Sequence, residues 1–184
     1  MQVDSFDSLA EYIATQTTKG DLAAVPIPLV AEHLNVSSPA VAAMLSDGRL
    51  DGVRIGKNTL VTLSSLQARQ TKRAGQESTV HKFLMKRAKE GVRAVFYEPV
   101  MAQVGMSPRV PADRTRIGGI LGAISEKTYA EDGVLLSVLV HQKKAGTTRP
   151  GNGFFDLARA LKFNWKDDDA FIKEQTDKVL AVYS

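Results

Sequence analysis

The residues that could carry out chemistry are few and scattered. The chain has no cysteine, and its three histidines (His33, His81 and His141) form no HxH or HExxH motif, which argues against a zinc site. No GxxxxGK[ST] phosphate-binding loop and no GxSxG nucleophile motif occur. The remaining catalytic candidate is a divalent-metal nuclease, in which Asp132 and Lys143 would flank a predicted hairpin.

This nuclease site would be incomplete. Such a site needs a second acidic ligand beside the lysine to share the charge of the metal, and that place holds His141 or Gln142. The acidic run "DDD" at residues 167–169 is explained most simply as the start of a helix. The sequence therefore favours a protein without catalysis or cofactor, with the metal nuclease kept as an alternative.

The composition is that of an ordinary globular protein. Of its 184 residues, 43% are hydrophobic and 24% are charged, which argues against wholesale disorder. The longest apolar runs, such as "VLLSVLV", are too short to span a bilayer. The acidic N-terminus lacks the basic region of a signal peptide, and the absence of cysteine fits a reducing compartment. We therefore expect a cytoplasmic protein that does not associate with membranes.

Positive charge is concentrated in the middle of the chain. The net charge is +4 overall, but it is −4 over residues 1–50, +6 over residues 51–100, +3 over residues 101–150 and −1 over the last 34 residues. Clustered lysine and arginine are typical of a protein that binds a polyanion. A solvated surface that is merely rich in basic residues would give the same count.

Two helices and a hairpin are predicted before residue 68, after a first helix that includes Ile13. The segment "VPIPLVAEHLNV" predicts one helix, the turn follows at Asn35 and Val36, and Ser37 or Ser38 is a suitable N-cap for the next. Pro39 suits the first turn of this second helix, and Gly48 ends that helix. The stretch "GVRIGKNTLVTL" alternates around a Gly-Lys-Asn turn, which predicts a β-hairpin.

The order of these elements, with the segments "VAEHLNVSSPAV", "GRL", "VRIGKN" and "LSSL", resembles the excisionase and MerR-like winged-helix family over residues 27–67. The resemblance implies that the second helix enters the major groove with Ser38, Ala42 and Ala43, and that the wing contacts phosphates. The sequence departs from the family where alanines replace arginine, tyrosine or lysine. Alanine makes only apolar contacts with bases, so we expect this module alone to bind weakly, or to bind protein instead of DNA.

A second module of the same plan is predicted after residues 68–79, a polar, basic segment that we expect to be a linker or a frayed helix end. Its helix from Pro111 shows a buried pattern of isoleucine and leucine, and "VLLSVLVHQKKAGTTRPGNGFF" predicts a strand, a long basic turn and a second strand or helix start. The stretch around this turn is similar to a signature of uncharacterised bacterial proteins, which implies no function. An amphipathic helix is expected near the C-terminus.

Three glycines on the helix from Pro111 are unusual. Gly118, Gly119 and Gly122 fall with Thr115 on the side opposite the isoleucines, although glycine weakens a helix by about 1 kcal/mol relative to alanine. Their grouping suggests that a DNA backbone or another helix, in this chain or in a second copy, approaches closely.

Together these features predict a helix-rich α+β protein of two winged-helix-like modules, at residues 1–67 and 80–184. We expect it to bind double-stranded DNA as a homodimer or higher oligomer, as a transcriptional regulator or as a recombination or replication accessory factor of a mobile element. The alternative is an interaction protein that binds or inhibits a host nucleoprotein. The expected DNA contacts are Ser37, Ser38, Arg49, Arg54, Lys57, Asn58, Arg69, Lys72, Arg73, Lys82, Lys86, Arg114, Arg116, Lys143, Lys144 and Arg149.

Overall fold

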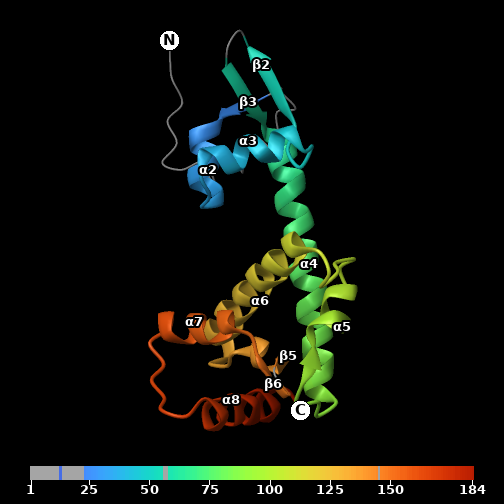
Figure 1. Ribbon diagram of the computed structural model, residues 1–184, viewed down its shortest axis with the longest axis vertical. Coiled ribbons are helices and arrows are strands. Elements are labelled where there is room, and N and C mark those ends of the chain that lie inside the picture. The colour runs from blue at the N-terminus through green and yellow to red at the C-terminus, as the bar shows by residue number, and fades with distance from the viewer. Residues whose placement is uncertain (1–12, 14–22, 56–57, 145) are drawn as a thin grey trace. The chain divides into compact units, whose positions relative to one another are not determined.

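The chain divides into two compact units, Met1–Lys72 (unit 1) and Arg73–Ser184 (unit 2), which Figure 1 shows as ribbons. This computed structural model describes residue 13 and residues 23–55, 58–144 and 146–184. Helices predominate among these residues, and the strands form two three-stranded sheets, one in each unit. The expected helix-rich α+β class is therefore confirmed.

Unit 1 places two short helices beside an antiparallel sheet. The sheet order is β1-β3-β2, and Val53 of β2 lies opposite Leu60 of β3. Val30, Val41 and Val61 are fully buried between the helices and the sheet, and Ile13 is buried with them. The elements are β1 (Ala24–Pro26), α2 (Ile27–Leu34), α3 (Ser38–Ser46), β2 (Gly52–Ile55) and β3 (Asn58–Thr62).

Local sequence signals set the boundaries of α2 and α3. Asn35 ends α2 in the left-handed conformation, with φ of 53°, which asparagine tolerates better than most residues. Ser37 caps α3, because its hydroxyl accepts a hydrogen bond from the backbone N–H of Ala40 at 3.4 Å. Pro39 lies in the first turn of α3. The predicted turn and cap are therefore confirmed.

The segment expected to be a linker or a frayed helix end, residues 68–79, is helical. It belongs to α4 (Leu63–Lys89), and the division between the units falls inside this helix. The segment contains one glycine and no proline, and its alanine, arginine, glutamine, lysine and glutamate residues favour helix. An i, i+4 ion pair between Arg73 and Glu77, with Nε and Oε1 2.9 Å apart, adds to this preference.

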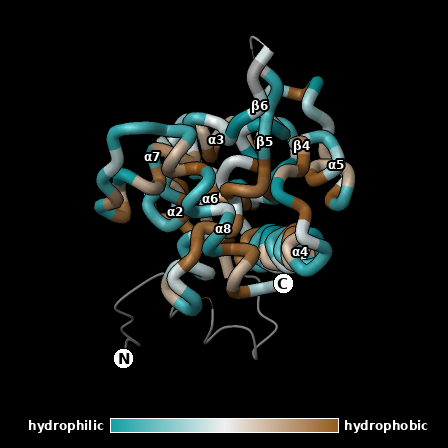
Figure 2. Tube along the Cα trace, turned by 90° about the horizontal axis from the view of Figure 1, so that it is seen from below, coloured by the Kyte–Doolittle hydropathy of each residue, from teal (hydrophilic) through white to brown (hydrophobic). Residues whose placement is uncertain are grey.

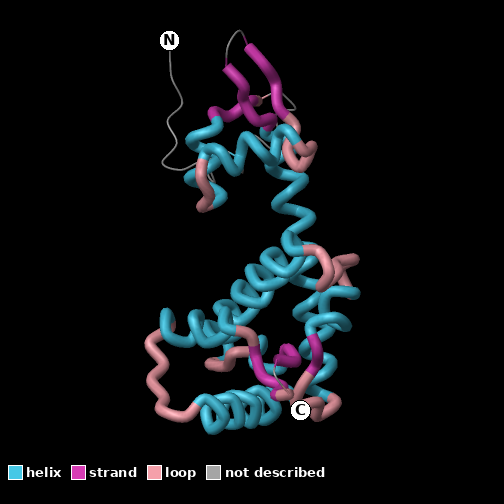
Figure 3. Tube along the Cα trace, viewed as in Figure 1, coloured by secondary structure: helices cyan, strands magenta, loops and turns pink. Residues whose placement is uncertain are grey.

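Unit 2 surrounds a small mixed sheet with helices, as Figure 3 shows. Strand β4 pairs in parallel with β5, and β5 pairs antiparallel with β6. The elements are β4 (Val95–Phe96), α5 (Tyr97–Ala102), α6 (Pro111–Asp132), the 3-10 helix η1 (Leu136–Leu139), β5 (Val140–Lys144), β6 (Thr147–Pro150), α7 (Asn152–Ala160) and α8 (Asp168–Tyr183).

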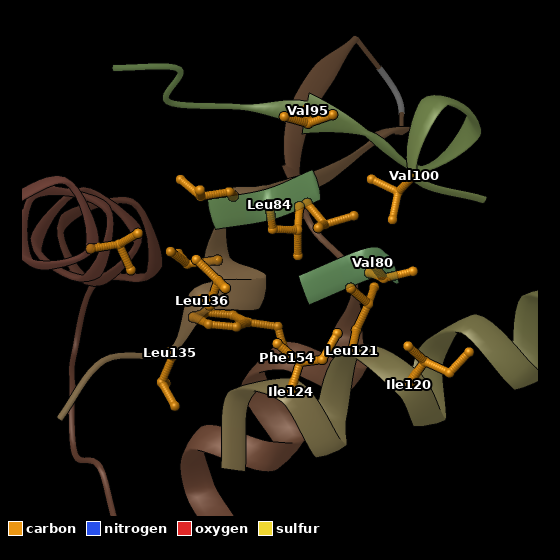
Figure 4. Packing of buried hydrophobic residues seen from close by; sticks show 14 of the residues in the cluster. Val80, Leu84, Val95, Val100, Ile120, Leu121, Ile124, Leu135, Leu136 and Phe154 are labelled. Carbon is orange, nitrogen blue, oxygen red and sulfur yellow. The ribbon is translucent and has the colours of Figure 1, made fainter. Parts of the chain in front are cut away.

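The core of unit 2 gathers side chains from nearly all of these elements (Figure 4). The buried face predicted for α6 is confirmed, and its buried hydrophobic side chains are Ile117, Ile120, Leu121 and Ile124. A small polar contact crosses the core between α6 and η1. The Ser125 hydroxyl donates to Ser137 Oγ at 2.7 Å and accepts from the backbone N–H of Ser137 at 2.9 Å, so these buried groups are satisfied.

The apolar run "VLLSVLV" differs from the expectation of a strand, because most of it forms η1. Every residue from Val134 to Val140 is buried, whereas a strand with one solvated face would expose alternate residues. The Thr128 hydroxyl donates to the carbonyl of Val134 at 2.8 Å and fixes the entry to this segment. Consequently Lys143 and Lys144 lie in strand β5 and Arg149 lies in β6, not in a long turn.

Candidate nucleic-acid interface

Three exposed lysines follow one face of α4 in unit 2. Lys82, Lys86 and Lys89 are exposed, and their i, i+4, i+7 spacing places them on the same side of the helix over roughly 10 Å. The opposite side carries the buried Val80 and Leu84, so the core fixes the direction in which the lysines point. Figure 2 shows α4 nearly end-on, with hydrophilic residues along much of its trace. We call these three residues the lysine row.

The lysine row is largely free of internal ion pairs. Among the described residues, Lys82 and Lys89 have no ion-pair partner. The Nζ of Lys86 lies 3.9 Å from Glu90, whose carboxylate is bound more closely by Arg87 at 2.9 Å. Exposed pairs of this kind contribute little to stability. The row can therefore bind an external anion without breaking a strong internal contact.

In unit 1 the exposed face of α3 is neutral. Pro39, Ala42, Ala43 and Ser46 are exposed on it. The two serines predicted to contact DNA are at its start: Ser37 is exposed but holds the N-cap, and Ser38 is half-buried. This face therefore offers small side chains and no positive charge.

The predicted cations of unit 1 are not equally available. Arg54 on β2 and Asn58 on β3 are exposed, whereas Lys57 lies outside the described residues. Arg49 is bound to Asp47, with Nε 2.8 Å from both carboxylate oxygens, and this hydrogen bond lowers the pKa of Asp47. On α4, Lys72 is exposed and Arg69 is half-buried. Arg54 and Lys72 are thus the described cations of unit 1 that an anion could reach most directly.

Other predicted contacts in unit 2 have partners inside the protein. Arg73 pairs with Glu77, as described above, and Arg149 Nη2 lies 2.7 Å from Asp168. Lys143 is exposed, with its ammonium 5.0 Å from the centre of the Phe96 ring. The side chain of Lys144 lies outside the described residues. Lys143 is therefore the described lysine of this hairpin that faces solvent.

The glycine face of α6 is open. Gly118 and Gly119 are exposed and Gly122 is half-buried, and a Cβ built on any of the three would have no neighbour within 4 Å among the described residues. Arg114 and Arg116 flank this face and are exposed, and Arg114 donates to the carbonyl of Pro108 at 2.8 Å. Gly118 and Gly122 nevertheless line a small cavity with Tyr97 and with Leu157 of α7, so a helix of this chain lies beside part of the face. Gly119 does not line that cavity, so a close partner there would be DNA or a second copy.

Gly119→Ala tests whether the open face is covered. We expect the variant to raise the free energy of unfolding by about 1 kcal/mol, because alanine favours helix over glycine and the site has room for a methyl group. Chemical denaturation measures the change. Gly91→Ala is the control: its site is equally open, but its φ of 71° should make alanine destabilising. A destabilising Gly119→Ala would instead show that another molecule packs on this face.

The residues of the candidate nuclease site have other roles. Asp132 accepts a hydrogen bond from the Tyr183 hydroxyl. His141 is buried, with Nε2 3.0 Å from the carbonyl of Val138, and burial lowers the pKa of its imidazole. Among the described residues, no group of three or more histidine, cysteine, aspartate or glutamate side chains could hold a metal ion. The described geometry therefore gives no support to the nuclease alternative.

The segment "STVHKFLMKRAKEG" predicts a helix with Val80 and Leu84 on its apolar stripe and with Lys82, Lys86, Arg87 and Lys89 on its outer face. Lys89 is not among the DNA contacts expected from the sequence, and the structure adds it to them, whereas Arg87 is half-buried and pairs with Glu90. The acidic run at residues 167–169 behaves as expected: Asp167 accepts from the backbone N–H of Ala170 at 2.9 Å and caps α8.

No described helix is long and apolar enough to span a membrane. Comparisons with family models, curated proteins and solved structures found no match.

Proposed function

We propose that this protein binds double-stranded DNA without catalysis, mainly through phosphate contacts made by unit 2. The observation that carries this proposal is the lysine row on α4. Three exposed lysines on one helix face, held outward by a buried apolar stripe on the other, supply the clustered charge that attracts a nucleic-acid backbone. Unit 2 also holds 18 of the 24 basic residues, against 13 acidic ones.

Unit 1 has a smaller part in this proposal. Its two helices and hairpin occur in the order expected of a winged helix-turn-helix, which supports that interpretation. The neutral exposed face of α3 can contribute apolar contacts to bases, while Arg54 can reach phosphate. Phosphate contacts position a protein on DNA, whereas base contacts give sequence preference. A role in transcription, or in recombination or replication of a mobile element, by a cytoplasmic homo-oligomer would follow from such binding.

The second candidate is a protein-interaction module that binds or inhibits a nucleoprotein. The observation that favours it is the same neutral face of α3, with the exposed apolar residues Leu29 and Val36 also in unit 1. Exposed apolar side chains without charge suit a protein partner at least as well as a DNA groove.

Binding of the full chain to a mixed-sequence duplex, measured over a series of salt concentrations, tests the proposal. We expect log K to fall linearly with log salt, with a slope of about −3 or steeper, because each phosphate contact contributes about −0.9. Fluorescence anisotropy of a labelled duplex gives both the affinity and the slope. Absence of binding at low salt would contradict the DNA proposal and favour the interaction module.

A further inference from the structure

A polar cleft of about 350 Å³ lies in unit 2 between the hairpin and the helices that follow it. We call it the α7 cleft. Strands β5 and β6, helix α7 and the start of α8 form its walls, and its polar lining side chains are Gln142, Arg149, Asn152, Asp156, Arg159 and Asp168. Two guanidinium groups, two carboxylates and two side-chain amides thus line one small space.

Both arginines are held against aromatic rings. The guanidinium carbon of Arg149 lies 5.6 Å from the centre of the Phe155 ring, and that of Arg159 lies 5.3 Å from the centre of the Trp165 ring. Stacking of this kind restricts an arginine side chain before a ligand arrives, so less conformational entropy is lost when it binds. The two cations are therefore arranged in advance on the wall of the α7 cleft.

Each arginine retains donors beyond its internal ion pair. A guanidinium has five N–H donors. Arg149 contacts Asp168 through Nη2, and Arg159 contacts Asp156 through Nη1. The Nε of Arg149 is buried and has no hydrogen-bond partner among the described residues, which is a costly state for a donor. The Arg159–Asp156 pair is largely exposed, at 63% and 71%, and pairs of this kind are weak.

Asp168 is the group that opposes an anion most directly. One of its oxygens binds Arg149 at 2.7 Å, and the other accepts the indole N–H of Trp165 at 2.7 Å. The carboxylate oxygen on Arg149 lies where a phosphate oxygen could bind, because a guanidinium donates to both kinds of anion. Asp168 therefore occupies part of the anion-binding capacity of Arg149.

We propose that the α7 cleft binds a phosphate group, through Arg149 and Arg159, with Asp168 as the internal competitor. The phosphate would be either a phosphodiester of the DNA backbone or a free phosphate. The first source rests on the proposed function, whereas the second does not. Gln142 and Asn152 supply further amide donors at the same walls.

Trp165 allows a direct test, because it is the only tryptophan in the chain and it contacts both Asp168 and Arg159. Its fluorescence is titrated in the full-length protein with duplex DNA and, separately, with inorganic phosphate at constant ionic strength. We expect a saturable change with one or both. A response to DNA alone identifies the phosphodiester, and a response to inorganic phosphate identifies a site for free phosphate. No saturable change with either ligand overturns the proposal.

The variant Arg149→Ala with Arg159→Ala should lose this response. Its matched control is Arg93→Ala with Lys127→Ala, which removes the same charge from two ion-paired residues of unit 2 that lie outside the lysine row and the α7 cleft. The control should respond like the parent protein. A response that persists in the first double variant overturns the proposal.

Asp168→Asn gives an independent reading should the double variant fail to fold. The amide oxygen can still accept the Trp165 N–H, but the charge on Arg149 is released. We expect half-saturation at roughly threefold to tenfold lower ligand concentration, as removal of a competing charged hydrogen bond implies. Unchanged or weaker binding overturns the proposal. Duplex binding that persists without any Trp165 response would remove the α7 cleft proposal and leave the DNA proposal intact.

Discussion

Replacing Lys82, Lys86 and Lys89 together by alanine should weaken DNA binding about a hundredfold at moderate salt. Each lysine that neutralises a phosphate contributes about 0.9 to the salt slope, so the slope should become shallower by roughly two to three units. The three side chains are exposed and lie opposite the buried stripe of α4, and alanine favours helix. The fold should therefore be retained, which circular dichroism checks, while anisotropy of a labelled duplex measures affinity and slope.

The control for this variant changes the net charge by the same amount. Lys127, Lys173 and Lys178 are exposed lysines on helices of unit 2, but each has a carboxylate partner four residues away. Replacing these three by alanine should reduce the affinity much less than replacing the lysine row. Equal losses in the two triple variants would mean that net charge, and not the lysine row, determines binding, and the assignment of the interface to α4 would be wrong.

Phe171→Ala should cost unit 2 about 3 to 5 kcal/mol in free energy of unfolding, the range for truncation of a buried phenylalanine. Phe171 is 4% exposed and stacks on Trp165, with ring centres 4.3 Å apart and planes 7° apart. It also contacts the rings of Phe154 and Phe163. The truncation leaves a cavity where α8 meets α7 and the connection between them, and urea unfolding followed by far-ultraviolet circular dichroism measures its cost.

Phe96→Ala is the matched control for this loss. Phe96 lies on β4 and is 41% exposed, so its truncation should cost about 1 kcal/mol or less. If the two truncations cost the same, the aromatic cluster around Phe171 would not be the stabilising contact between α8 and the rest of unit 2.

Local signals in the sequence predict much of the secondary structure. The turn at Asn35, the cap at Ser37 and the start of α6 at Pro111 all appear where their residue types favour them, because capping and turn formation depend on neighbours within a few residues. The buried face of α6 follows in the same way from its helical period. The lysine row could also be derived, since the direction of its side chains depends only on the apolar stripe of the same helix.

Tertiary structure decides which of the remaining basic residues are available. Arg149 is a predicted DNA contact by its position in a basic hairpin, but in the fold it meets Asp168, which lies 19 residues away. Likewise Val134–Val140 has the composition of a strand, yet the surrounding helices bury all of it and most of it forms a 3-10 helix. Both outcomes depend on which distant segments pack together, and that contact is not encoded in the spacing of nearby residues.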